Sequence, residues 1–331
     1  MSPVSTREIT LVTGHHARSR GAAAAEIADT HGTICVPVPR MVEIEPWVRH
    51  TTTHGEGIIA ELSHDAAVEP AIAEISEAAH TTLAEVICVV QAAAFIDDLL
   101  DDEYFTVEGE VPALYVARAL RMVQHIEHAS ALLVTEWTEL ATRDLSILLA
   151  VLSHLAPAAR IRLDGSASNA PATTWSETSH QPGWVRVLNA EHRPHMTDPR
   201  VRAFRYEQIR PFHPGRLSEL LQTRFGDGEF GAVIRSAGFC RLATRPGIVG
   251  GWEHVGQMIS LAPLAHDDSP LSDPLAVGEE IAFIGIDLDV PSLRRAFDAA
   301  ALTDDELIAG PEAWARFDDP FPLWATAGDE R

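Results

Sequence analysis

The chain has 331 residues, 46% of them hydrophobic and 22% charged, which is the composition of a globular protein with two domains and excludes a disordered or fibrous one. Its formal net charge of −23 repels nucleic acid and anionic membranes, so we expect no direct binding to RNA, DNA or lipid. No apolar run is long enough to span a bilayer and no signal peptide opens the chain, so a cytoplasmic protein is expected.

Strand and helix patterns alternate over residues 1–165. Short apolar runs predict strands at 9–12, 33–38, 57–62, 85–90, 131–134 and 160–163, and helical patterns cover 22–29, 66–79, 112–128 and 142–155. This alternation predicts an α/β domain with a mostly parallel sheet that helices cover on both faces. Ligands of such sheets bind at the carboxyl ends of the strands.

The pattern changes in the second half of the chain. Residues 166–200 have little apolar periodicity and are predicted to be a linker. Residues 201–331 follow with predicted strands at 201–206, 232–242 and 279–287 and helices at 214–224 and 291–300. A capping-box sequence that begins at Thr303 predicts one more short helix. We therefore expect a second, smaller α+β domain at 201–331.

The junction of the first strand and first helix has the position of a nucleotide-binding loop but not its sequence. Such a loop needs Gly-x-x-x-x-Gly-Lys-Ser/Thr, in which lysine neutralises the phosphates and the hydroxyl holds magnesium. Here Gly14 is followed by Ser19, Arg20 and Gly21 at the three later positions, and the whole chain contains no lysine. These four residues form at most a vestigial phosphate loop, so we expect neither GTP nor magnesium to bind and no catalytic residue to be present.

Histidines supply the candidate metal site, because histidine is the commonest metal-binding side chain. His50 and His54 would share one face of a helix, with His64 and Asp65 shortly after. The alternative is a set of solvated loop histidines, since three threonines between His50 and His54 oppose a helix. The cysteines Cys35, Cys88 and Cys240 are too far apart for a disulfide framework or a Cys-x-x-Cys site and are expected to be small buried side chains. The acidic stretch that includes Asp97 and Asp98 is expected to be a solvated helix end.

The C-terminal third resembles the CobW family, which consists of P-loop GTPases and metallochaperones with a CobW C-terminal domain. The matching segments occur in the family's order and are Pro182–Trp184, Glu191–Pro194, Arg210–Leu217, Arg235–Phe239, Leu242–Pro246, Trp252, Phe283–Asp287, Leu302–Leu307, Gly310–Trp314 and Asp319–Trp324. The resemblance implies a P-loop-NTPase-like first domain and a CobW C-terminal second domain.

The same resemblance is weaker in the first half, where the family's functional motifs are lost. Glu61-Leu62-Ser63 resembles the pair after the third strand, but Gln91 replaces the acid of Val-Val-Asp-Ala. Thr138 stands where a carboxylate would recognise guanine, and the family's Cys-x-Cys-Cys metal motif is absent. The chain is therefore identified as a degenerate member, a pseudo-GTPase.

Three hypotheses about function follow. The preferred one is a non-catalytic protein that acts by binding a protein partner in metal homeostasis or metal-cofactor delivery, with zinc as the metal that the resemblance implies. The second is a divergent GTP hydrolase in which Arg20 replaces the loop lysine. The third is a translation-linked adaptor, because degenerate actinobacterial relatives of this family recruit a ribosome hibernation factor under zinc limitation.

Overall fold

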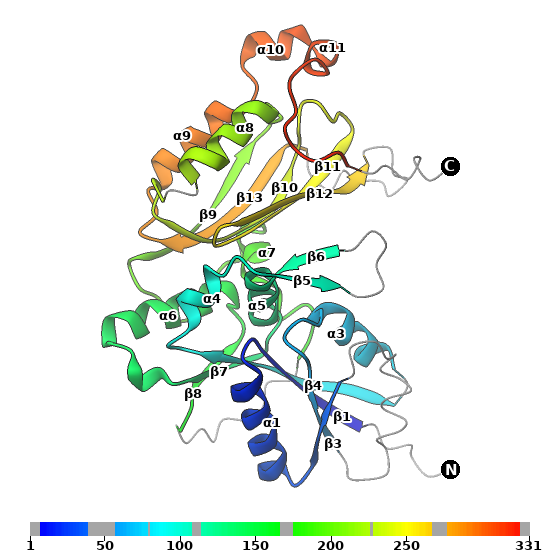
Figure 1. The fold of residues 1–331 in the computed structure, drawn as a ribbon, viewed down its shortest axis with the longest axis vertical. Coiled ribbons are helices and arrows are strands. Elements are labelled where there is room, and N and C mark those ends of the chain that lie inside the picture. The colour runs from blue at the N-terminus through cyan, green and yellow to red at the C-terminus, as the bar shows by residue number, and fades with distance from the viewer. Residues whose placement is uncertain are drawn as a thin grey trace. The chain divides into compact units, whose positions relative to one another are not determined.

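The computed structural model describes residues 7–38, 57–78, 80–107, 114–165, 175–225, 228–266 and 277–324. It divides into two compact units (Figure 1). Unit 1 comprises residues 1–183 and 193–198, and unit 2 comprises residues 184–192 and 199–331. In the described part of the chain, no helix is both long and apolar enough to span a bilayer.

Unit 1 is a parallel sheet flanked by helices, as the sequence predicted. Its strands lie in the order β2-β3-β1-β4-β7-β8, and every pairing between neighbours is parallel. The strands are β1 (Arg7–Gly14), β2 (Ile34–Pro37), β3 (Gly57–Glu61), β4 (Thr81–Gln91), β7 (Ala131–Thr135) and β8 (Arg160–Leu163). The helices are α1 (Ala17–His31), α3 (Val68–Glu77), α4 (Phe95–Leu99), α5 (Arg118–Glu127) and α6 (Thr142–Leu155), with a 3₁₀ turn at Trp137–Glu139.

The core of unit 1 occupies both faces of this sheet. Alternate residues of β1 point to opposite sides: Ile9 and Leu11 pack with α3, and Val12 packs with the alanines of α1. Each of these three side chains is fully buried. The sheet is therefore buried on both faces where these helices lie, as a parallel sheet requires.

Two predicted helix boundaries in unit 1 are wrong. Helix α1 begins at Ala17 rather than at residue 22, because the amide of Arg20 already bonds the His16 carbonyl at 3.0 Å. The predicted helix at 112–128 begins at Arg118, and its described preceding residues form β6 (Leu114–Ala117), paired with β5 (Tyr104–Val107) in an antiparallel ladder. Aromatic and β-branched residues such as Tyr115 and Val116 favour that strand over a helix.

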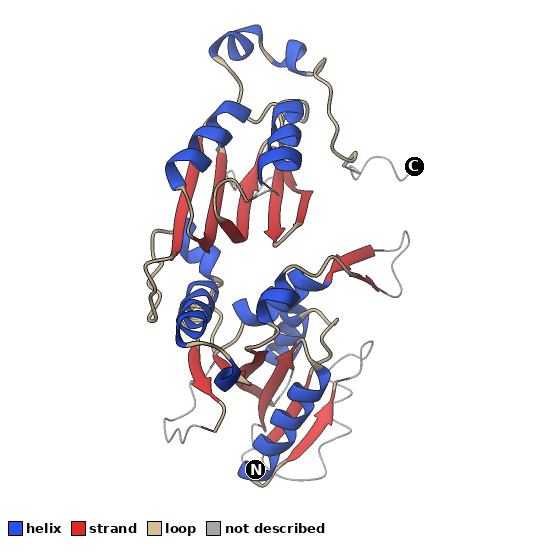
Figure 2. Cartoon of the chain, turned by 60° about the vertical axis from the view of Figure 1, so that its left-hand side comes forward, coloured by secondary structure: helices blue, strands red, loops and turns tan. Residues whose placement is uncertain are grey.

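Unit 2 is an antiparallel sheet in the order β12-β11-β10-β13-β9. Its strands are β9 (Val201–Gln208), β10 (Ala232–Cys240), β11 (Ile248–Val255), β12 (Met258–His266) and β13 (Glu279–Ile286). Helices α8 (Pro214–Leu220) and α9 (Val290–Ala300) lie side by side on one face (Figure 2) and bury an aromatic core that includes Phe297. The predicted α/β sheet with a second, smaller α+β domain is confirmed.

The remaining elements of unit 2 were only partly predicted. Helix α7 (Gly183–Leu188) packs Val187 and Leu188 on the opposite face of the sheet, so its helices do not all lie on one side. A π-helical turn (Leu221–Phe225) extends α8, and α10 (Asp304–Ala309) begins at the capping box of Thr303, as predicted. Helix α11 (Pro311–Trp314) follows it. Strands β11 and β12 were not predicted, because Gly250, Gly251 and Pro263 are unfavourable in strands.

Candidate functional site

The junction between β1 and α1 is short. Only His15 and His16 lie between the end of β1 at Gly14 and the start of α1 at Ala17. His16 is the N-cap residue, in an extended conformation with φ −86° and ψ 110°, and its side chain makes no capping hydrogen bond. The amide of Arg20 already bonds the His16 carbonyl, so the residue at the lysine position lies within the helix and its amide is occupied.

The Arg20 side chain points into the protein and is bonded there. Its Nη1 donates to the carbonyl oxygen of Gly14 at 2.7 Å, and its Nε donates to Glu61 Oε1 at 2.9 Å. The side chain of Arg20 is 7% exposed and that of Glu61 is 22% exposed. The charge at the lysine position is therefore neutralised by a carboxylate of the same chain, at the end of β3.

Gly14 is retained for a packing reason. Its φ is +145°, and a Cβ at this position would lie 2.6 Å from the backbone oxygen of Val89 on β4. A side chain there would force β1 and β4 apart. Gly21 carries no hydroxyl for magnesium, and Ser19 lies within α1. The four residues of the vestigial loop are thus accounted for by a strand contact, an internal ion pair and a helix.

A second carboxylate faces the same junction. His16 Nε2 lies 2.7 Å from Asp98 Oδ2, and His15 Nε2 lies 3.9 Å from Asp98 Oδ1. Asp98 belongs to α4, and its side chain is 14% exposed, so the expectation that it lies on a solvated helix end is wrong. Burial lowers the pKa of His15 more than Asp98 raises it, so this imidazole is neutral near pH 7.

The positions that match the family's motifs after β4 and β7 contact each other. Gln91 ends β4 and donates from Nε2 to Glu136 Oε2 at 2.5 Å. Glu136 follows β7 in a left-handed conformation with φ 55°. Thr138 lies in the adjacent 3₁₀ turn, where its side chain offers no carboxylate. An amide–carboxylate bond therefore links the positions that matched the family's acid and its base-recognition segment.

The predicted metal site falls partly outside the described residues. His50 and His54 lie there, so a site that includes them stays a prediction. His64 and Asp65 follow β3: the His64 ring lies 6.0 Å from that of His15, and Asp65 accepts a hydrogen bond from Ser63 at 2.5 Å. Among the residues that the structure describes, no three histidine, cysteine or acidic side chains are arranged to hold a metal ion.

The cysteines do not add to such a site. Cys35 is half-buried on β2, Cys88 is buried on β4 and Cys240 is buried on β10, and all three are free thiols. Burial raises the pKa of Cys88 to about 12, so its thiol stays protonated and is a poor metal ligand. The expectation of small buried side chains is confirmed for Cys88 and Cys240.

In unit 2, the segment Arg210–Leu217 joins two distant parts of the chain. His213 caps α8 by accepting from the Arg216 amide at 3.4 Å, and Pro214 occupies the first helical turn. The Arg216 guanidinium binds both carboxylate oxygens of Glu306, each at 2.7 Å. This ion pair holds the pKa of Glu306 at about 2 and fixes α10 to the start of α8. The segment is therefore explained by its structural contacts.

Comparison with known proteins assigns unit 2. Residues 201–301 match the family described as the Cobalamin synthesis protein cobW C-terminal domain. Unit 2 therefore contains a CobW C-terminal domain. Its match to the "Zinc-regulated GTPase metalloprotein activator 1" of Dictyostelium discoideum is 25% identical over 229 residues and covers 61% of this chain. The chain spans about half of that relative's length, since the match covers 48% of it.

Two solved structures are also similar to this chain. Zn(II)-bound YjiA GTPase from E. coli is 12% identical with a TM-score of 0.36, and the comparison covers 90% of this chain and 100% of YjiA. A Zn(II)-bound triple mutant of YjiA GTPase is 13% identical with a TM-score of 0.39 at the same coverages.

The CobW-like segments near the C-terminus pack on the CobW C-terminal domain. Arg245 donates to both carboxylate oxygens of Asp319, at 3.0 and 3.1 Å, and its guanidinium lies 4.3 Å from the ring of Trp324. The Trp324 indole donates to the Leu261 carbonyl at 3.0 Å. A Cβ on Gly250 would lie 2.7 Å from that ring, so the glycine in β11 makes room for Trp324. These contacts extend the domain beyond residue 301.

Proposed function

We propose that this chain is a CobW-family protein of metal homeostasis that acts by binding a protein partner and neither binds nor hydrolyses GTP. The observation that supports this most directly is Arg20, whose guanidinium is bonded to Gly14 and Glu61 inside the protein. A triphosphate needs a free cation at this position. The name of the curated relative, a zinc-regulated GTPase metalloprotein activator, supports both the metal and a protein partner.

Electrostatics at the junction also oppose a nucleotide. Glu61 cancels the charge of Arg20, and Asp98 brings a second carboxylate to the same junction through its contact with His16. At a separation of 4 Å near a protein surface, two like charges repel by about 4 kcal/mol. The residues present therefore do not fit GTP with magnesium.

Calorimetric titration of the full chain with GTP and Mg²⁺ tests this proposal. We expect no binding heat, and we expect none from a variant with the loop sequence restored, Ser19→Gly/Arg20→Lys/Gly21→Thr. The reason is that α1 begins before these residues and leaves a junction of only two residues. Micromolar binding accompanied by phosphate release in the native chain would overturn the proposal and favour the divergent hydrolase.

The metal part of the proposal needs a separate measurement. Elemental analysis of the purified chain, after incubation with ZnCl₂ and desalting, measures bound zinc in the native protein and in His50→Ala/His54→Ala. We expect zinc in the native chain and its loss in the double variant. Retention of zinc by the variant would reject the site formed by His50, His54, His64 and Asp65. No zinc in either protein would restrict the chain's role to partner binding.

A further inference from the structure

The helices of unit 1 are distributed unequally over the two faces of its sheet. Helix α1 connects β1 to β2, which lies towards one edge of the sheet. Helices α3, α5 and α6 lie in the connections that lead towards the opposite edge, from β3 to β4, from β4 to β7 and from β7 to β8. Because such crossovers are right-handed, helices that run in opposite directions along the sheet lie on opposite faces. Among the described residues, one face therefore carries three long helices and the other carries α1 alone.

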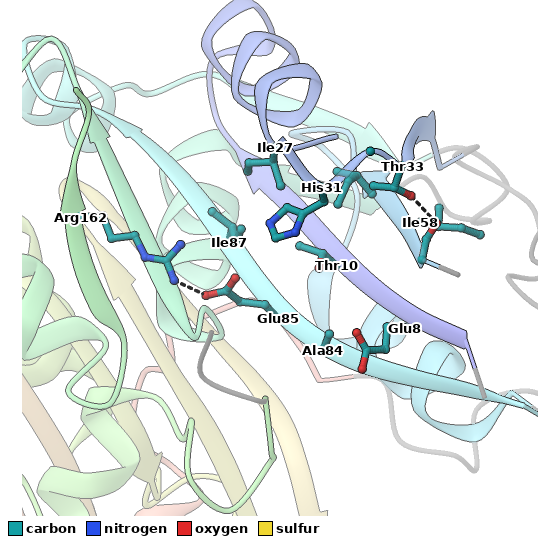
Figure 3. A pocket seen from close by; sticks show the side chains of 13 residues that line it. Glu8, Thr10, Ile27, His31, Thr33, Ile58, Ala84, Glu85, Ile87 and Arg162 are labelled. Atoms are coloured by element: carbon teal, nitrogen blue, oxygen red, sulfur yellow. Dashed lines mark hydrogen bonds and ion pairs between the residues drawn. The ribbon is translucent and has the colours of Figure 1, made fainter. Parts of the chain in front are cut away.

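Among the described residues, no second helix lies beside α1 on this face. The main contacts of α1 are with β1, β2, β3 and β4, which leaves β7 and β8 beside it. Two adjoining cavities of about 510 and 460 Å³ lie there and share Ile27, His31, Glu85, Ile87 and Arg162. We call this space the α1–β8 trough. Figure 3 shows α1 along one side, Arg162 of β8 on the other and β4 between them.

The width of the α1–β8 trough matches one helix. Neighbouring strands are about 4.8 Å apart, so β4, β7 and β8 span about 10 Å. Packed helices lie about 8–10 Å from their neighbours. A helix laid over β7 and β8 would therefore contact α1 at the normal distance and cover the exposed part of the sheet.

The chemistry of the trough is apolar at its floor and acidic at its borders. Ile87 and Ala131 are buried on the floor, and Leu133 beside them is half-buried. The exposed carboxylates of Glu26 on α1 and Asp164 after β8 line opposite borders.

The one arginine among the lining residues is already paired inside the trough. Arg162 Nη2 donates to Glu85 Oε1 at 2.8 Å, as the dashed line in Figure 3 marks, so its charge is neutralised within the protein. Glu85 is 6% exposed, and its burial raises the pKa of this carboxyl. The charges left at the borders are therefore negative.

We propose that the α1–β8 trough binds an amphipathic helix of a partner protein, with an apolar face against β7 and positively charged residues along both borders. This inference rests on the proposed function, which requires a protein partner, and it names the surface and the chemistry of that partner. An apolar stripe at i, i+3, i+4 and i+7 would bury against Ile27 and Leu133, which are the half-buried apolar side chains of the lining. Lysine or arginine beside the stripe would pair with Glu26 and Asp164.

Selection of displayed helical peptides tests the proposal. A phage library of 16-residue helical peptides with random surface positions is selected on the immobilised full chain, and enriched peptides are synthesised with a fluorescent label. Anisotropy then measures their affinity for the native chain and for Glu26→Lys/Asp164→Lys. The matched control is Asp305→Lys/Glu312→Lys, which makes the same change of net charge at exposed carboxylates of unit 2.

We expect enriched peptides to be amphipathic and basic. Their affinity should fall at least tenfold on Glu26→Lys/Asp164→Lys and change less than threefold on the control. Enrichment of acidic or uncharged peptides, equal losses on both double variants, or no enrichment would each overturn the proposal. GTP titration of the same preparation separates the two proposals: GTP binding overturns the proposed function alone, and absent peptide binding without GTP binding overturns the trough alone.

Discussion

Replacement of Arg20 by methionine tests whether the residue at the lysine position serves the fold or a ligand. Arg20→Met removes the guanidinium but keeps an unbranched apolar stem of similar length. The lost bonds are those to the Gly14 carbonyl and to Glu61, of which only the second is partly exposed. Hydrogen bonds to charged groups contribute about 1.5–3 kcal/mol each, and breaking a buried ion pair costs about 3–5 kcal/mol. We expect the free energy of unfolding of unit 1 to fall by about 3 kcal/mol.

Amide hydrogen exchange of α1 and β1 measures this loss within unit 1, independently of unit 2. The control is Arg18→Met, which changes an exposed arginine of the same helix and should alter exchange little. A double-mutant cycle with Glu61→Gln then isolates the energy of the pair. Unchanged exchange in Arg20→Met would refute the reasoning. So would slower exchange of the native chain on addition of GTP and Mg²⁺, because a ligand that binds the folded state stabilises it.

Three further predictions concern packing and pH. Gly14→Ala should destabilise unit 1 by about 2–4 kcal/mol in urea unfolding, because its Cβ would lie 2.6 Å from the Val89 oxygen. Glu306→Gln should lower the free energy of unfolding of unit 2 by about 1–2 kcal/mol at pH 7. This difference from the native chain should vanish as pH falls from 4.5 through 2, because the Arg216 pair holds the pKa of Glu306 at about 2. Burial lowers the pKa of His125 from 6.5 to about 3, so the free energy of unfolding of unit 1 should fall by about 1.4 kcal/mol per pH unit as the pH is lowered from 6.5 to 3. Hydrogen exchange should show a weaker pH dependence in His125→Gln.

Elements with a clear local pattern could be predicted from the sequence. Helix α6 and strand β8 have the predicted bounds, because the spacing of apolar residues within each segment is enough to indicate its secondary structure. The β5–β6 hairpin and β11–β12 could not be predicted in this way, since their stability depends on pairing between segments. Gly250 illustrates the difficulty: it disfavours a strand locally, yet the ring of Trp324 requires it.

The sequence shows which residues occupy the candidate site, but it does not show the contacts that they make. The loss of the loop lysine is visible at Arg20, but the direction of its side chain depends on Glu61, 41 positions later. The bond between His16 and Asp98 joins residues 82 positions apart. Local periodicity contains no information on such contacts. The predicted parallel sheet indicates only that residues that follow its strands lie at one edge of the sheet.

At the junction of β1 and α1, groups of the protein itself make contacts of the kind that a phosphate makes in a nucleotide-binding loop. In a nucleotide-binding loop, the anion holds the cationic side chain and orders the backbone between strand and helix. Here Glu61 supplies the negative charge to Arg20, and the Gly14 carbonyl accepts its second bond. Asp98 holds the two histidines that remain between strand and helix. A ligand would have to break these bonds before it could bind, so under the proposed function the contacts that stabilise unit 1 also oppose nucleotide binding.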